Sequence, residues 1–251
     1  MRSALVIALA FGLSSATAQS ADIKVLTAGA FKPVVTALAP QFEKATGHTL
    51  VIDNDTAGGL SKRIEAGEAF DVVFLPPATL GALSGKGFVS ADGQANVAQV
   101  GIGVAVKEGV PLPDIASVDG FKTALQNAKA IAVIDPKAGG SSGIYLADLF
   151  QKWGIADTLK PKLVLVPGGL VATRLMTGEA DLAIHQISEI LAVKGARLVG
   201  PLPADIQNFT VYRGALATKA SQREPAAAFL ELMKSPAAAA ILKEKGMEPP
   251  R

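Results

Sequence analysis

The chain has 251 residues and carries 24 basic against 22 acidic side chains, a balance that predicts neither nucleic-acid binding nor a basic membrane patch. It contains no cysteine, which excludes disulfides, thiolate metal sites, a cysteine nucleophile and a lipid-anchored cysteine. Hydrophobic residues make up 49% of the chain and aromatic residues only 5%, a composition typical of parallel strands alternating with alanine-rich helices.

The first residues match the pattern of an export signal. Arg2 supplies a positive charge, residues 4–13 form an apolar run too short to span a bilayer, and the small side chains of Ala16 and Ala18 suit signal peptidase. We therefore expect residues 1–18 to be a signal peptide, cleaved before Gln19. Without a cysteine to carry a lipid, the mature chain is expected to be a soluble periplasmic protein.

Strand and helix signals alternate along the first part of the mature chain. Their apolar spacing predicts strands at 23–27, 49–52 and 71–75, helices at 33–45 and 60–66, and loops at 28–30 and 53–59. Pro40 lies inside the first helix and predicts a kink or a division into two short helices.

The same order returns further along the chain. It predicts strands at 131–134, 163–166 and 181–185, helices at 144–153 and 170–177, and loops at 135–143 and 167–169. Longer strands at 100–107 and 209–217 would connect the two series, and helices at 225–234 and 236–245 end the chain. We expect an α/β fold of two lobes, each a mostly parallel sheet flanked by helices, joined by two crossover strands. Lobe 1 would comprise residues 19–102 and 205–251, and lobe 2, inserted into it, residues 103–204.

An internal similarity supports two lobes. Gly58-Gly59-Leu60 leads to Gly67-Glu68-Ala69 and an apolar strand, and Gly168-Gly169-Leu170 leads to Gly178-Glu179-Ala180 and another. Each copy predicts a short helix, a glycine that ends it, and an acidic turn into a strand. Chance is the competing explanation, because Gly, Ala and Leu are abundant here.

Four of the predicted strand-to-helix turns consist of small residues, at 28–30, 56–59, 138–143 and 167–169. In open α/β sheets such turns line the crevice where ligands bind. Glycine and alanine leave the first N–H groups of a helix accessible, and the helix dipole favours negative charge there by roughly 0.3 to 1 kcal/mol. Together the turns predict a site for an anion, although any single one could simply be a tight connection.

Several polar side chains could complete this site: Thr56, Ser141 and Ser142 as hydroxyl donors, His185 and Gln186 at a strand end, and Lys32 and Arg174 as cations. The hydroxyls could instead cap their own helices, the histidine could be structural, and the cations could be solvated.

Catalysis has weaker support than binding. Ser141 or Ser142 with His185 and Asp135 supplies the residue types of a serine hydrolase, but Gly140-Ser141-Ser142-Gly143 is not the G-x-S-x-G elbow. No His or carboxylate cluster has metal-ligand spacing, and the phosphate-binding glycine motifs are absent. We expect a binding protein without enzymatic activity, cofactor or metal, and keep a periplasmic serine hydrolase as the alternative of another class.

Four motifs carry a resemblance to a known family: Val25-Leu26-Thr27-Ala28-Gly29-Ala30, the L-x-x-x-I-E-A-G run from Leu60 to Gly67, Asp135-Pro136 followed by Gly143-Ile144-Tyr145, and Ser235-Pro236-Ala237-Ala238. Over essentially the whole mature chain the sequence resembles the periplasmic molybdate-binding proteins, which are substrate-binding components of ABC importers. The resemblance implies the two-lobed periplasmic binding protein fold, closure around a small dehydrated anion, and delivery to an ABC permease, by a protein that we expect to be a monomer. Presentation of the solute to a membrane sensor is the alternative to transport.

The site departs from the family pattern. Ala30 and Ala57 stand where the family has ligand-contacting serines, Gln186 stands at the place of a tyrosine, and Ser142 adds a hydroxyl. We expect a molybdate-like oxyanion as the ligand, and these changes make a small organic acid the alternative. The predicted ligand-binding residues are Gly29, Ala30, Thr56, Ala57, Gly58, Ser141, Ser142, Gly168, Gly169 and Gln186.

Overall fold

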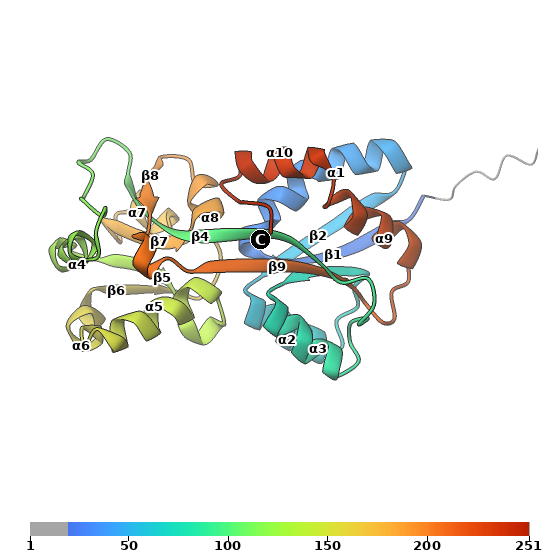
Figure 1. The fold of residues 1–251 in the computed structure, drawn as a ribbon, viewed down its shortest axis with the longest axis horizontal. Helices are drawn as coiled ribbons and strands as arrows, with labels where there is room; N and C mark the ends of the chain where they lie inside the picture. The colour runs from blue at the N-terminus through green and yellow to red at the C-terminus, as the bar shows by residue number, and fades with distance from the viewer. Residues whose placement is uncertain (1–19, 251) are drawn as a thin grey trace, which may run out of the picture.

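The computed structural model describes residues 20–250, which form an elongated molecule with helices around strands that run between its two ends (Figure 1). The strands are β1 (Asp22–Ala28), β2 (Thr49–Asp55), β3 (Val72–Leu75), β4 (Ala95–Lys107), β5 (Ile131–Ile134), β6 (Leu163–Val166), β7 (Leu182–Gln186), β8 (Ala196–Pro201) and β9 (Phe209–Leu216). The α-helices are α1 (Lys32–Thr46), α2 (Ala57–Glu65), α3 (Pro77–Gly85), α4 (Val118–Asn127), α5 (Ser141–Lys152), α6 (Ala156–Leu159), α7 (Thr173–Thr177), α8 (Ile187–Leu191), α9 (Arg223–Leu232) and α10 (Pro236–Glu244). Short 3-10 helices are η1 (Gly29–Phe31), η2 (Pro136–Ala138), η3 (Lys160–Lys162) and η4 (Ala204–Ile206).

The α/β class is confirmed, but the two separate sheets that we expected are joined into one mixed sheet. Its order is β2-β1-β3-β9-β4-β7-β5-β6, with β8 paired to β4. The strand β4 causes the continuity: its residues 95–101 pair with β9, and its residues 102–107 pair with β7 and β8. Within each group the strands of the strand-helix units are parallel, whereas β4 and β9 run antiparallel to their neighbours.

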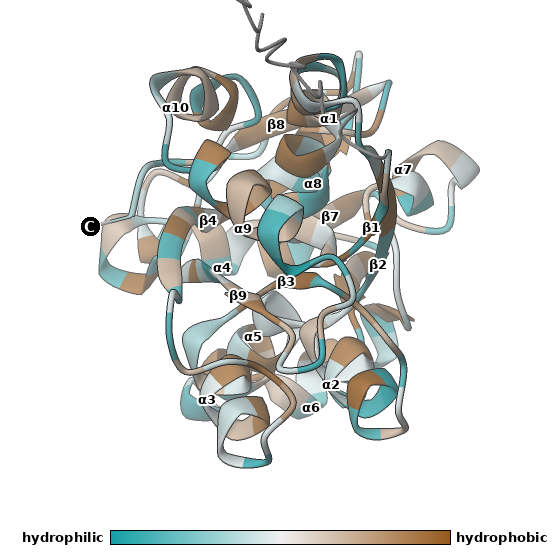
Figure 2. Cartoon of the chain, turned by 90° about the vertical axis from the view of Figure 1, so that its right-hand side faces the viewer, coloured by the Kyte–Doolittle hydropathy of each residue, from teal (hydrophilic) through white to brown (hydrophobic). Residues whose placement is uncertain are grey.

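The hydrophobic core is divided in the same way. One buried cluster takes its residues from 23–100 and 212–247, and two others take theirs from 102–202. We call the regions around these clusters the first half and the second half. In the first half, α1 and α10 cover one face of the sheet, and α2 and α3 cover the other (Figure 1, Figure 2).

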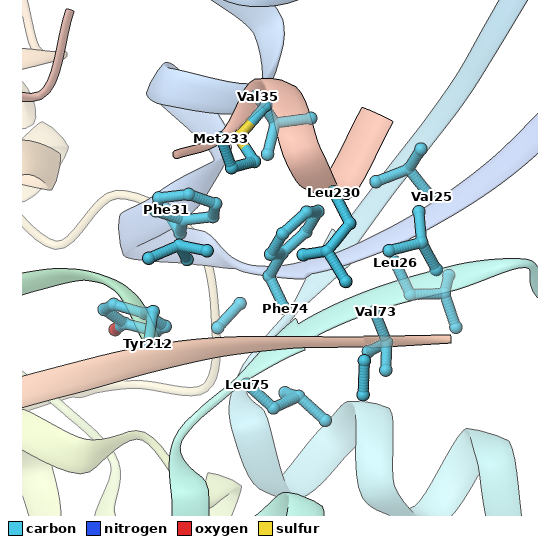
Figure 3. Close-up of a cluster of buried hydrophobic side chains, with 14 of the residues drawn as sticks. Val25, Leu26, Phe31, Val35, Val73, Phe74, Leu75, Tyr212, Leu230 and Met233 are labelled. Carbon is cyan, nitrogen blue, oxygen red and sulfur yellow. The ribbon is translucent and has the colours of Figure 1, made fainter. Parts of the chain in front are cut away.

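An aromatic group at the centre of the first half fixes the turn after β1. The ring of Phe31 lies 5.0 Å from that of Phe74 and 5.8 Å from that of Tyr212, and all three side chains are buried (Figure 3). Such pairs contribute about 0.5 to 1.5 kcal/mol each beyond the burial of their area. Because Phe31 directly follows Gly29 and Ala30, this packing holds the Gly29-Ala30 turn in place.

The two similar sequence segments occupy equivalent structural positions. In the first, the Asp71 carboxylate accepts the N–H of Lys24 at the start of β1, and in the second the Asp181 carboxylate accepts the N–H groups of Lys129 and Ala130 before β5. The helices before them, α2 and α7, are both followed by a glycine with positive φ, Gly67 at 97° and Gly178 at 76°.

Most predicted strands and helices are present, with a few corrections. The helix α1 continues through Pro40 because that residue lies on its exposed face, where water can satisfy the carbonyl left without an N–H partner. The helix α7 starts at Thr173, three residues later than predicted, and the predicted loop at 53–59 is shortened by β2 and α2. The elements α3, α4, α6, α8 and β8 were not predicted.

The predicted signal peptide, residues 1–18, lies outside the described residues. Within residues 20–250 no single helix has the length and apolar character to cross a membrane, and only α9 with α10, bent by 64°, meets that criterion as a pair.

Candidate functional site

A cavity lies between the two halves and takes its lining from both. Its cavity volume is about 40 Å³, within about 430 Å³ of space that is not occupied by protein atoms and is partly open to solvent. Eight of the ten predicted ligand-binding residues line it: Gly29, Ala30, Thr56, Ala57, Ser141, Ser142, Gly169 and Gln186. The remaining lining residues are Ala28, Asn54, Asp55, Ile134, Gly140, His185, Glu189 and Tyr212. Gly58 and Gly168 are not among them.

Two helices begin at this cavity, α2 from the first half and α5 from the second. Ala57, Ser141 and Ser142 are their first residues, and an N–H in this position has no partner within its helix. The hydroxyls of Ser141 and Ser142 make no hydrogen bond to another described residue, and Ser142 is 3% exposed. The cavity therefore offers backbone and hydroxyl donors to an anion.

Glycines allow α5 to start so close to β5. A Cβ at Gly143 would overlap the carbonyl oxygen of Ile134, and one at Gly140 would lie 2.9 Å from the Ile134 side chain. The small residues of this turn thus serve packing and also leave its N–H groups uncovered.

Two of the predicted ligand donors instead join the halves. The Thr56 hydroxyl accepts the N–H of Gly59 at 2.9 Å as an N-cap and donates to the carbonyl of Ala138. The N–H of Gly58 donates to the Gly139 carbonyl at 3.2 Å, and a Cβ on Gly139 would lie 2.6 Å from the Cα of Gly58. This edge of the cavity is therefore closed by direct backbone contact.

A second contact closes the cavity near α8. The hydroxyl of Ser188 donates to the carbonyl of Ala30 at 2.8 Å, and both residues are buried. The first turn of α8 is thereby held against the Gly29-Ala30 turn.

An acid and a base meet in the cavity wall. His185 lies near the end of β7 and Glu189 in the following helix α8, so that Nε2 of His185 is 3.3 Å from Oε2 of Glu189. Burial lowers the pKa of His185 to about 3 and raises the pKa of Glu189 to about 8. At neutral pH the pair is therefore mainly an imidazole beside a carboxylic acid, both uncharged, rather than an ion pair.

Gly29 makes room for this acid, because a Cβ there would lie 2.6 Å from Oε1 of Glu189. The sequence pattern pointed to His185 as a candidate but not to Glu189. An i,i+4 pairing of His185 with Glu189 was the available signal, and it was missed because no helix was predicted after residue 185.

Gln186 is anchored by neighbouring polar groups. Its Nε2 donates to the hydroxyl of Thr210 at 2.9 Å, and its Oε1 accepts from the hydroxyl of Tyr212 at 2.7 Å. Burial is the main cause that raises the pKa of Tyr212, and the nearby Glu189 adds to it. This network links β7 to β9 at the cavity wall.

The two candidate cations lie elsewhere. Lys32 donates to Oδ1 of Asn54 at 2.7 Å from an exposed position, and Arg174 pairs with Glu179 at 3.0 Å. In the first copy of the duplicated segment, Arg63 pairs with Glu68 at 2.6 Å, again five residues later. Arg174 is thus the structural counterpart of Arg63. No Lys or Arg lines the cavity, and no group of three or more His, Asp or Glu in residues 20–250 could hold a metal.

This geometry agrees with a comparison with known families. A family model described as bacterial extracellular solute-binding protein matches residues 23–248. The chain belongs to this solute-binding protein family. The resemblance drawn from the sequence motifs is confirmed at this level.

Individual relatives of this solute-binding protein carry different names. An aconitate isomerase from a Pseudomonas species is 33% identical over 233 residues, covering 90% of this chain and 87% of the relative. A molybdate-binding protein from Azotobacter vinelandii is 27% identical over 259 residues, covering 97% and 96%. The solved structure of an Azotobacter vinelandii periplasmic molybdate-binding protein shares the fold, with a TM-score of 0.77 at 24% identity over 91% of this chain and 100% of that one.

Proposed function

We propose that this solute-binding protein captures a small carboxylate anion in the cavity between its halves and delivers it to an ABC permease from the periplasm. The observation that carries the proposal is the combination of free N–H and hydroxyl donors at the starts of α2 and α5 with an uncharged acid, Glu189, in one buried cavity. A protonated carboxyl group donates a hydrogen bond to a carboxylate, whereas an ionised one would repel it.

The donor set favours a carboxylate over a tetrahedral oxyanion. A dehydrated oxyanion needs hydrogen-bond donors on all sides to replace its water. Ala30 and Ala57 contribute no side-chain donor, and the Thr56 hydroxyl already binds Ala138. Aconitate, the compound in the name of the 33% identical relative, is a small tricarboxylate. The molybdate-binding relatives keep a molybdate-like oxyanion as the second candidate.

We further propose that the halves are lobes that close around the solute, with residues 19–102 and 205–251 in lobe 1 and residues 103–204 in lobe 2. The separate hydrophobic clusters support this division, and β4 and β9 would act as the hinge. Contacts across the cavity from Gly58 to Gly139 and from Ser188 to Ala30 support a closed conformation here.

A serine hydrolase has less support than a binding protein. Ser141, Ser142 and His185 line the same cavity, but Nε2 of His185 faces Glu189, and no described hydrogen bond joins either serine to the histidine.

Isothermal titration calorimetry on the mature protein tests the proposal. The panel comprises trans-aconitate, citrate, tricarballylate, succinate, molybdate, tungstate, sulfate and phosphate. We expect a dissociation constant near micromolar, about 8 kcal/mol, for at least one polycarboxylate. Micromolar binding of molybdate or tungstate without binding of any carboxylate would overturn the assignment.

A further inference from the structure

We propose that the cavity also moves a proton between two carbon atoms of the carboxylate that it binds, with Glu189 as the catalytic acid–base and His185 as the residue that positions it. The inference rests on the proposed function, carboxylate capture, and adds a reaction to it. The geometry of the buried His185–Glu189 pair supports this reaction, in addition to the presence of the binding cavity.

The pair is placed as an acid–base group would be. Glu189 lines the cavity and Nε2 of His185 approaches it at 3.3 Å, with the two side chains 9% and 4% exposed. Within the described residues the Glu189 carboxyl makes no hydrogen bond, and Tyr212 is the other polar group that its charge affects; Nδ1 of His185 is buried without a partner. Buried polar groups are ordinarily hydrogen-bonded, and removing ionisable groups from water reduces stability. If the pair had only a structural role, we would expect its buried polar atoms to have more hydrogen-bond partners than they have here.

The surroundings leave the pair able to hold or release one proton. Asp55 and Tyr212 are the other titratable residues of the cavity lining, and no Lys or Arg takes part in it. Asp55 accepts the N–H of Thr56 at 2.7 Å and lies 3.8 Å from Arg63, so its charge has its own partners. Tyr212 donates to Gln186. No fixed cation therefore keeps Glu189 ionised, and perturbed groups of this kind concentrate at catalytic sites.

Proton transfer at a carbon atom of an unsaturated carboxylate is one reaction that such a pair can carry out without a cofactor. A carbon-bound proton becomes removable when the carbon is attached to a C=C bond that is conjugated with a carboxylate. In an unsaturated polycarboxylate with a CH2 group beside such a double bond, loss of that proton gives an allylic anion, and reprotonation at the far carbon moves the double bond. Rotation about the former double bond interconverts the cis and trans forms.

The proton balance closes within the site. In the fraction of the protein whose Glu189 has released its proton to solvent, the Glu189 carboxylate removes the proton from the substrate CH2 group, while Nε2 of His185 holds the carboxylate in position. The electron pair of the broken C–H bond spreads over the allyl system into a carboxylate, where the N–H groups of Ser141 and Ser142 would stabilise the charge. Glu189 then gives this proton to the far carbon and is again a carboxylate, ready for the next turnover.

The test is proton NMR of trans-aconitate with the mature protein in D2O. We expect deuterium at the CH2 and vinyl positions and the appearance of the cis isomer. Glu189→Gln should reduce the exchange rate at least about 100-fold, and Glu189→Asp should retain part of it. His185→Gln should slow exchange and change its pH profile, which a merely structural histidine would not do. The matched control is Glu179→Gln, which alters an exposed acid outside the cavity and should leave the rate unchanged.

Binding is measured in parallel so that the two proposals fail separately. Tricarballylate has the carboxylates of aconitate but no double bond, so calorimetry with it reports capture alone for each variant. If tricarballylate and trans-aconitate bind and no deuterium enters, the catalytic inference is wrong and carboxylate capture stands. If neither binds, carboxylate capture itself is wrong. Exchange at the unmodified rate in a folded Glu189→Gln variant would overturn the role of Glu189.

Discussion

Replacing Glu189 by glutamine should remove a loss of stability that the protein otherwise suffers between pH 6 and pH 8. Burial raises the pKa of Glu189 in the folded protein to about 8, from an ordinary value of 4.5. The folded protein therefore keeps a proton in this window that the unfolded chain has lost. The resulting stabilisation of the protonated form is fully present below pH 4.5 and is lost as the pH rises through 8.

The size of the effect follows from the two pKa values. Each pH unit between them changes the free energy of unfolding by about 1.4 kcal/mol, with the slope halved at pH 8, so Glu189 lowers stability by about 2 kcal/mol between pH 6 and pH 8. His185 acts in the opposite direction and mostly at lower pH, because its folded pKa of about 3 lies below the ordinary 6.5. Its penalty grows as the pH falls from 6.5 to 3.

Urea unfolding at pH 6, 7 and 8 measures the difference. From pH 6 to pH 8 the free energy of unfolding of the original chain should fall by about 2 kcal/mol more than that of Glu189→Gln. The control Glu179→Gln changes an exposed residue, and its free energy of unfolding should fall as much as that of the original chain. A difference between the original chain and Glu189→Gln that stays constant over the three pH values would show that Glu189 is not held protonated by burial.

Three further changes test other parts of the site. Gly139→Ala places a Cβ 2.6 Å from the Cα of Gly58, which opposes closure, so carboxylate binding should weaken about tenfold in a calorimetric titration. The control is Gly154→Ala: Gly154 has a similar positive φ, but no atom lies within 4 Å of an added Cβ, so this variant should bind the carboxylate normally. Ser142→Ala removes a buried hydroxyl from the cavity and should also weaken binding about tenfold, with Ser61→Ala, on the exposed side of α2, as the control; equal affinities for the two variants would refute contact with the solute. Asp71→Ala leaves the donors on Lys24, Ser221 and Gln222 without their acceptor and should cost about 3 kcal/mol in urea unfolding, whereas the exposed Asp181→Ala should cost about 1 kcal/mol; equal losses would contradict the difference in burial.

Much of the fold followed from the sequence because the strand-helix units are long and regular. The short helix α8 did not, since its five residues continue the apolar pattern of β7 and carry no proline or glycine to mark a boundary. Missing α8 meant missing Glu189. The burial of a glutamate, and therefore its raised pKa, depends on η1 and β4 packing around it, which no local pattern reports.

The candidate site could also be predicted only in part from the sequence. The small residues in the turns identified which N–H groups are accessible, and most of the predicted residues meet in one cavity. For Thr56 and Gly58, however, the function of the donor depends on a partner about 80 residues away, Ala138 or Gly139. The sequence shows that a hydrogen-bond donor is present, but it does not show which acceptor the fold places opposite that donor.

The duplicated segments explain why the acid–base pair lies on one side of the cavity. Both copies keep the arginine–glutamate pair and the aspartate that accepts N–H groups at the neighbouring strand. In the first copy the helix α2 starts at the cavity and presents the N–H of Ala57. In the second copy α7 starts only at Thr173, outside the lining, and of its glycine pair only Gly169 reaches the cavity. The chain that follows the second copy, from β7 into α8, brings His185 and Glu189 instead. Glu189 lies in the first turn of α8, where the helix dipole favours an ionised carboxyl group, so its burial is what raises its pKa and keeps it protonated.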